Sequence, residues 1–372
     1  MTNVLLNDNN RHRKYTGVDK FHAAGYYGER VKAASGESWN MKYDPEGQVH
    51  DPLGIADVGY SGTHAVHTCC TFFQVAPKAQ LYMLESTGGR YYGNGSYENK
   101  FLGKSVDIIE KENITNMFTS LTTNNNTNWL NDMKKWLQNH PEFKQFWAAG
   151  NDDTDTFNPI MVIDEVFGVA AYTLMVSGDV VPAGYSSVSE YVDFSAPSMI
   201  YTYPEATKST DDGGAHSGTS FSTPWLCGMS CLVDDFFIDK TGKPLTQKGM
   251  YQFFKDNTTD LKDEGFDSKT GWGAVRLPSP EKIVISNYAQ GGGETPMFTY
   301  FTQSKPRTDD SKFSQLYAKD YSALVEKISY EDIDEVGMSQ GNQPTETMQS
   351  FYNRQTKKPH ILINGGLFNM SN

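Results

Sequence analysis

From residue 18 to about residue 285, short apolar runs alternate with segments whose apolar residues recur at helical spacing. Residues 114–120 and residues 168–172 are apolar runs with the length of buried strands. Between them the sequence predicts an amphipathic helix whose core face is formed by Trp129, Leu130, Met133, Trp136 and Leu137. This alternation of predicted strands and helices is consistent with an α/β fold.

A glycine-rich turn at residues 214–218 leads into another apolar segment, with Ser220 predicted as the first residue of a helix. Pro224 falls in the first turn of this helix, where its missing N–H costs nothing. A helix N-terminus favours developing negative charge, which suits a nucleophilic hydroxyl at Ser220. Simple N-capping by Thr219 or Ser220 explains the same residues equally well.

Residues 218–224, Gly-Thr-Ser-Phe-Ser-Thr-Pro, resemble the nucleophile motif of the subtilisin-like serine proteases. Residues 59–84 are similar to the family's His-Gly-Thr-His helix and the Val-Ala-Pro strand entry after it, and residues 146–152 are similar to its Ala-Ala-Gly-Asn turn. The resemblance implies a three-layer α/β fold with a mainly parallel sheet, and we expect this domain to span residues 17–286.

The resemblance assigns Ser220 to the nucleophile position and Asn151 to the oxyanion position. A carboxamide N–H at Asn151, together with the backbone N–H of Ser220, would polarise a scissile carbonyl, an interaction worth roughly 3 kcal/mol of barrier. Closure of a turn by Asn151 is the structural alternative.

The two remaining triad positions depart from the family. When Gly-Thr-His at residues 62–64 is aligned with the motif, the catalytic histidine position falls on Ser61, and His64 matches the second, structural histidine. The catalytic aspartate position falls on Glu37; a competing alignment that places it on Tyr15 requires a buried strand in the highly charged residues 9–14. Since a hydroxyl is too weak a base to deprotonate a serine at neutral pH, the triad is expected to be degenerate.

We therefore expect a pseudoprotease, a subtilisin-fold module inactive as a protease that serves as a structural or binding scaffold for protein or peptide partners. The alternative is an active subtilisin-like serine endopeptidase that uses Ser220 with a non-standard base. His216, His64, His67 or Glu37 itself are the candidates for that base.

The ends of the chain differ from its middle. Residues 1–16 are polar and are expected to form an N-terminal arm, and residues 287–296 form a glycine-rich linker. Residues 297–372 are expected to begin a second module. Within it residues 360–369 resemble the Ile-Asn-Gly-Gly-Phe-Phe signature of phosphodiester glycosidase domains, with Leu367 in place of the first aromatic residue. We expect the rest of that domain to be absent.

Composition and charge restrict the classes of partner that we expect for this chain. The formal charge of −13 without a basic block argues against a nucleic-acid partner, and no apolar run is long enough for membrane insertion. The N-terminus lacks the pattern of a secretory signal. The abundance of Asn and Tyr, together with the two modules, favours a bacteriophage tail or baseplate protein on a virion or extracellular surface, bound to other tail proteins. The four cysteines are read as buried apolar residues, with no metal or cofactor expected, and the oligomeric state stays open.

Overall fold

The computed structural model describes a set of ranges separated by gaps: residues 2–37, 44, 47–53, 64–84, 105–122, 127–155, 157–175, 177–202, 215–288, 325–328, 348–353, 358–363 and 366–370. The chain divides into two compact units, of which the first comprises residues 1–295 with 303–308 and the second comprises the remainder. Each unit is described by itself.

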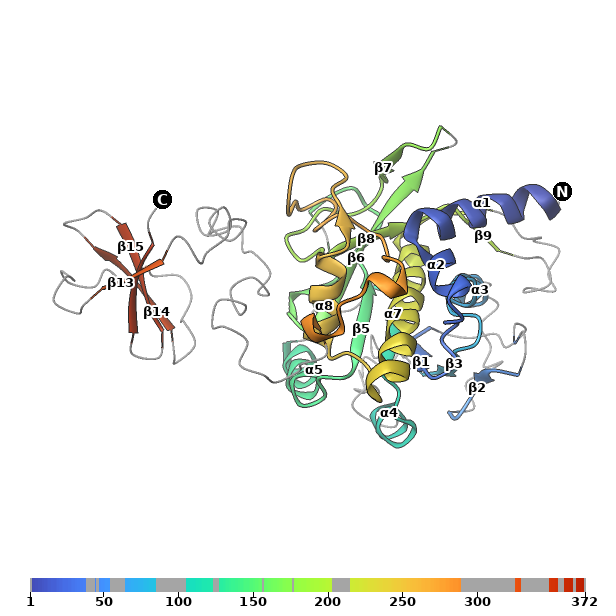
Figure 1. The fold of residues 1–372 in the computed structure, drawn as a ribbon, viewed down its shortest axis with the longest axis horizontal. Coiled ribbons are helices and arrows are strands. Elements are labelled where there is room, and N and C mark those ends of the chain that lie inside the picture. Colours follow the sequence, from blue (N-terminus) through green and yellow to red (C-terminus); the bar gives the residue numbers. More distant parts are fainter. Residues whose placement is uncertain are drawn as a thin grey trace, which may run out of the picture. The chain divides into compact units, whose positions relative to one another are not determined.

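The first unit is built on a ten-stranded, mainly parallel sheet (Figure 1). Its strands are β1 (Lys32–Ser35), β2 (Val49–His50), β3 (Gln80–Met83), β4 (Asn116–Thr119), β5 (Lys144–Ala148), β6 (Val166–Leu174), β7 (Val180–Pro182), β8 (Phe194–Pro197), β11 (Thr258–Thr259) and β12 (Ala274–Val275). The order is β11-β12-β8-β6-β5-β4-β1-β3-β2, with β7 paired to β6. Only the β6–β7 and β11–β12 pairs are antiparallel among these described strands.

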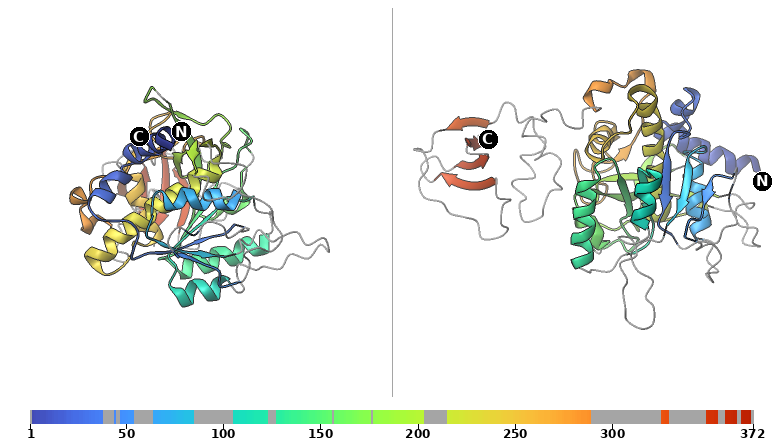
Figure 2. Two further views of the ribbon diagram at one scale, coloured as in Figure 1. Left: turned by 90° about the vertical axis from the view of Figure 1, so that its right-hand side faces the viewer. Right: turned by 90° about the horizontal axis from the view of Figure 1, so that it is seen from below.

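Helices cover both faces of this sheet and make three layers (Figure 2, left). One face carries α2 (Val18–Ala23), α3 (His64–Phe73), α7 (Thr219–Thr241) and α8 (Gln247–Lys255); the other carries α4 (Val106–Glu112) and α5 (Thr127–Asn139) with the 3₁₀ turn η2 (Pro159–Val162). Successive strand residues point to opposite faces, so Phe146 packs into the first cluster and Trp147 into the second. The predicted α/β class, the strands near 114–120 and 168–172 and the helix over 129–137 are confirmed.

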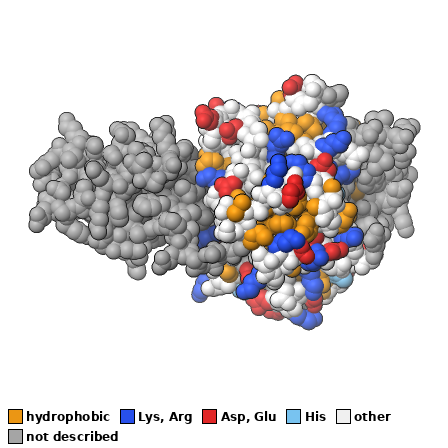
Figure 3. All heavy atoms as spheres, in the orientation of Figure 1, with side chains coloured by type: hydrophobic (Ala, Val, Ile, Leu, Met, Phe, Trp, Pro, Cys, Tyr) orange, Lys and Arg blue, Asp and Glu red, His pale blue; other side chains and the backbone are white. Residues whose placement is uncertain are grey.

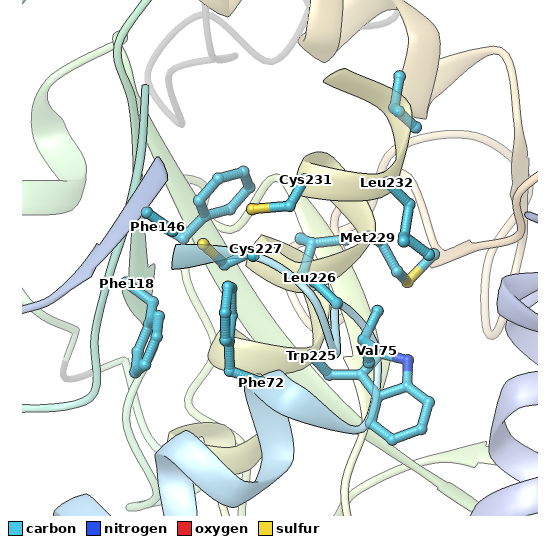
Figure 4. Close-up of a cluster of buried hydrophobic side chains, with 14 of the residues drawn as sticks. Phe72, Val75, Phe118, Phe146, Trp225, Leu226, Cys227, Met229, Cys231 and Leu232 are labelled. Atoms are coloured by element: carbon cyan, nitrogen blue, oxygen red, sulfur yellow. The ribbon is translucent and has the colours of Figure 1, made fainter. Parts of the chain in front are cut away.

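Helix α7 runs through the middle of the first cluster (Figure 4). Every residue from Thr219 to Phe237 is buried, because the helix packs against the sheet on one side and against α3 on another. Apolar residues therefore occur on all sides of the helix, as in a buried helix, and buried polar residues such as Ser230 and Asp234 occur among them. It begins at Thr219, one residue before the predicted start, so Pro224 is its sixth residue and lies inside the helix, beyond the first turn in which it was predicted.

A buried ion pair joins α7 to the sheet. Lys144 Nζ lies 2.9 Å from Asp234 Oδ2, and both side chains are fully buried. The ammonium also donates to the backbone oxygens of Leu245 and Glu142, while Asn116 and the Leu245 backbone N–H donate to the carboxylate. Burial raises the pKa of Asp234. This effect outweighs the lowering of that pKa by the charge of Lys144 and by the hydrogen-bond donors. The pair therefore depends on both partners.

Replacing Lys144 by Met is expected to lower the free energy of unfolding by about 3–5 kcal/mol at neutral pH, because the Asp234 carboxylate loses its partner. The pKa of Asp234 then rises further, so the folded state binds more protons than the unfolded state as the pH falls toward about 4. The loss in free energy of unfolding should therefore be smaller at low pH than at neutral pH. Urea unfolding at pH 8 and pH 5 measures both effects. The double variant Lys144→Met with Asp234→Asn should lose less than the sum of the two single variants. A loss below about 1 kcal/mol in Lys144→Met would contradict this account.

The N-terminal residues, expected as an arm, are helical. They form α1 (Thr2–Thr16), which packs on the domain. Asn9, His12 and Thr16 are buried at helical spacing, and the Asn9 side chain accepts from Tyr201 N and donates to Tyr201 O. Within residues 9–16 these buried residues are polar, and for that reason an apolar pattern did not reveal the helix. Tyr201 belongs to the ribbon of β9 (Ile200–Tyr201) and β10 (Ala215–His216) that leads into α7.

The described strands of the second unit form a four-stranded antiparallel sheet. They are β13 (Val325–Ile328), β14 (Met348–Asn353), β15 (Lys358–Ile363) and β16 (Gly366–Met370), in the order β13-β16-β15-β14. The signature at 360–369 spans β15 and β16, with residues 364–365 outside the described part. A sheet of this size does not identify a family, so the glycosidase-like module stays a prediction. Most of the proposed linker, from residue 289 on, also lies outside the described residues.

Two surface observations bear on partners. On the face of the first unit shown in Figure 3, basic and acidic side chains are interspersed around apolar ones. Among the described residues, no helix combines the length and hydropathy needed to cross a membrane.

Candidate active site

The turn before α7 places Ser220 in the first turn of that helix. Gly218 precedes the helix with φ 135°, a backbone conformation that favours glycine, and its N–H donates to the Tyr185 hydroxyl at 2.9 Å. Ser220 is 9 % exposed. The hydroxyl position therefore lies at the N-terminal end of a long helix, where backbone N–H groups have no partner within the helix.

Asn151 lies against this turn. It follows β5, and its side-chain oxygen accepts hydrogen bonds from the Thr219 backbone N–H at 2.9 Å and from Thr219 Oγ1 at 3.1 Å. Gly150 N also donates to Thr219 Oγ1. Because the carboxamide oxygen is engaged by Thr219, the Nδ2 group is the end of Asn151 that can donate to a ligand.

Glu37 lies just beyond the end of β1 and is 2 % exposed. Its Oε1 accepts from the Ser120 backbone N–H at 3.1 Å, and its Oε2 lies 2.9 Å from Nδ1 of His64. A carboxylate can only accept, so Nδ1 of His64 carries the proton. In neutral His64 the lone pair is then on Nε2, the tautomer that a general base needs.

This contact corrects the expectation that Glu37 has no imidazole to orient. A second register also fits the motif: His-Ala-Val-His at residues 64–67 has the same spacing of two histidines as His-Gly-Thr-His. In that register His64 is the first histidine and His67 the second. The histidine spacing was the signal that could have found it. Ser61, the residue first assigned to the base position, lies outside the described residues.

Ser120 connects the acid to the nucleophile helix. Its backbone N–H holds Glu37, and its Oγ donates to the Ser220 carbonyl oxygen at 2.8 Å. The His64 ring lies edge-on to the ring of Phe221, the residue after Ser220, with centroids 6.0 Å apart. The structure thus brings Glu37, His64 and the first turn of α7 into one contiguous site.

The other two histidines considered as bases are engaged elsewhere. Nδ1 of His67 lies 2.7 Å from Thr202 Oγ1, and its ring packs on His216 with centroids 4.0 Å apart. His216 in turn stacks on Phe221. Within the described part of the chain, His64 is the histidine that contacts Glu37.

Two opposing effects act on the pKa of His64. Desolvation lowers it, but the hydrogen bond and the negative charge of Glu37 together raise it by more, so the pKa of His64 lies above its usual value. The side chain is 43 % exposed, so solvent screens part of this interaction.

The described residues hold no group of three or more His, Cys, Asp or Glu side chains that could bind a metal ion. All four cysteines are buried thiols outside any disulfide.

The fold and these groups define the class of the subtilisin-like serine peptidases. The sequence model of the Subtilase family matches residues 35–273, and the chain belongs to that family. No curated protein matches the sequence.

Solved structures share the fold at low identity. A prenylagaramide maturation protease, PagA, is 15% identical with a TM-score of 0.55, and the match covers 71% of this chain and 96% of that protease. A lanthipeptide protease has the same identity and TM-score, with 72% and 93% covered. Fervidolysin from Fervidobacterium pennivorans, a keratinolytic enzyme, is 17% identical with a TM-score of 0.56, with 72% and 47% covered.

Proposed function

We propose that this chain is a serine peptidase whose triad is Ser220, His64 and Glu37. The observation that carries the proposal is the hydrogen bond between buried Glu37 and Nδ1 of His64. It joins Glu37, already assigned to the acid position, to the imidazole that the sequence-based hypothesis of a pseudoprotease held to be missing.

In the proposed mechanism Nε2 of His64 takes the proton from Ser220 Oγ as the oxygen attacks the scissile carbonyl. Glu37 keeps the imidazole in the correct tautomer and stabilises the imidazolium that forms. The negative oxygen of the tetrahedral intermediate is held by Asn151 Nδ2 and the Ser220 backbone N–H. His64 then protonates the leaving amine, and a water molecule repeats the sequence to release the acid.

The use of Glu37 instead of an aspartate is supported by how its side chain is held. A glutamate has one more rotatable bond to fix, and here both carboxylate oxygens are engaged, one by Ser120 N and one by His64. The buried position limits the side chain to this geometry.

A fluorophosphonate probe tests the proposal. The wild-type chain is expected to form a covalent adduct at Ser220, found by peptide mapping, because the probe reacts with activated serines. The variant Ser220→Ala controls for labelling elsewhere. Absence of an adduct in a folded wild-type chain would favour the pseudoprotease scaffold instead.

The substrates and the location of the protein remain proposals. Two solved proteins of this fold are a prenylagaramide maturation protease and a lanthipeptide protease, which supports a peptide substrate. Placement on a bacteriophage tail or baseplate and the glycosidase-like second module depend on composition and one short motif. Mass spectrometry of purified phage particles would test the placement on a tail or baseplate.

A further inference from the structure

Lys269 places a nearly buried ammonium beside the loop that carries Asn151. Its side chain is 12 % exposed, and Nζ donates to Asp153 Oδ1 at 2.6 Å, to the Ser186 carbonyl at 2.6 Å and to the Gly184 carbonyl at 2.9 Å. Two carbonyl oxygens and a carboxylate therefore converge on one cation. Without the ammonium these oxygens would face one another with no donor between them.

The turn that carries Lys269 is anchored to the sheet. The Asp267 carboxylate accepts from the backbone N–H groups of Lys269 and Thr270 and from the Thr270 hydroxyl. Gly271, with φ 63°, fits so closely that an added Cβ would lie 2.2 Å from the Asp193 carbonyl oxygen. The ammonium is thus held on a fixed base.

The segment that Lys269 binds is joined to the loop of Asn151 at several points. Asp153 N donates to the Tyr185 carbonyl, Ser187 N to the Gly150 carbonyl, and Asp152 N to Ser187 Oγ. The Tyr185 hydroxyl also accepts from Gly218 N, before the nucleophile helix. Residues 184–187 therefore contact both sides of the oxyanion position.

The loop needs such support, because Asp153 has φ 48°, in the left-handed region that non-glycine residues rarely adopt. Asn151 itself is exposed. A conformation of this kind persists where its surroundings determine it.

We infer that Lys269 is a positioning residue for the oxyanion site, acting through residues 184–187 and Asp153 to hold the Asn151 amide beside Ser220. The inference rests on the proposed peptidase function. It assigns to Lys269 a role in the acyl-transfer step, since a displacement of about 1 Å in a catalytic group can cost ~100-fold in rate.

The variant Lys269→Met keeps most of the stem and removes the charge. We expect kcat to fall about 10- to 100-fold with KM within about threefold, because Asn151 acts mainly on the transition state. Rates are normalised to the concentration of reactive Ser220, and thermal unfolding checks the fold. Lys262→Met is the matched control, since Lys262 is 55 % exposed and pairs with the neighbouring Asp263.

A double-mutant cycle separates positioning from general loosening. If Lys269 acts through Asn151, then Lys269→Met in an Asn151→Ala background should lower kcat by less than about threefold further. An equal fold-loss in both backgrounds would overturn the inference.

Chemical rescue provides a second variant. Lys269→Cys treated with 2-bromoethylamine regains an ammonium at nearly the original length, and kcat should recover at least about fivefold; iodoacetamide, which leaves a neutral group, should not restore it. The four native cysteines are buried and are spared under folding conditions. Unchanged kcat in Lys269→Met also overturns the inference, whereas a wild-type chain without hydrolysis or labelling is a failure of the proposed function.

Discussion

Replacing His64 by Ala is expected to lower kcat for a peptide ester roughly 10⁴- to 10⁶-fold, with thermal stability little changed. The imidazole is the group that takes the Ser220 proton in the proposed mechanism, and loss of one triad member removes nearly all the triad's contribution. The remaining activity would come from the oxyanion donors and substrate binding. Steady-state kinetics on the ester measures the fall in kcat, and labelling by the fluorophosphonate probe measures the reactivity of Ser220.

Ser61→Ala is the matched variant, because the two possible alignments of the histidine motif differ at these two positions. We expect it to keep kcat within about twofold. If His64→Ala retained wild-type activity, the assignment of the base would be wrong.

Replacing Glu37 by Gln is expected to have the second largest effect. The amide keeps the shape of the side chain but removes the charge, and the maximal kcat/KM should fall about 10³- to 10⁴-fold, as for loss of the acid in other serine triads. The hydrogen bond of Glu37 to His64 shows where the loss originates.

The same variant should also change the pH profile. Activity requires neutral His64, so kcat/KM rises as the pH increases through its pKa. Desolvation lowers this pKa, and Glu37 raises it by more. Without the carboxylate the acidic limb should therefore move to lower pH, while the wild-type limb lies above the ordinary histidine value of about 6.5. A limb that stays in place or moves to higher pH would contradict the role given to Glu37.

Much of the fold could be predicted from the sequence because local patterns of apolar residues determine its strands and helices. The short apolar runs became β4 and β6, and the helical spacing of Trp129 to Leu137 became α5. Helix α1 was missed because its buried residues Asn9, His12 and Thr16 are polar; Asn9 is hydrogen-bonded to Tyr201, and the His12 ring packs edge-on against Trp225.

The site was harder to predict because it is assembled from distant segments. Ser220, Asn151 and Glu37 were found from motifs, but the contact between Glu37 and His64 depends on where β1 ends and α3 begins. The local match of Gly-Thr-His favoured the register that places Ser61 at the base position. No sequence motif assigned a role to Lys269. The role inferred for it depends on the Gly184 and Ser186 carbonyl oxygens, which only the folded chain brings together.

The burial of α7 has a consequence for any mutational survey of this protein. Since each residue from Thr219 to Phe237 is enclosed, random substitutions along this helix will abolish solubility and turnover together. A library scored only for lost activity would be dominated by misfolded clones from this one segment.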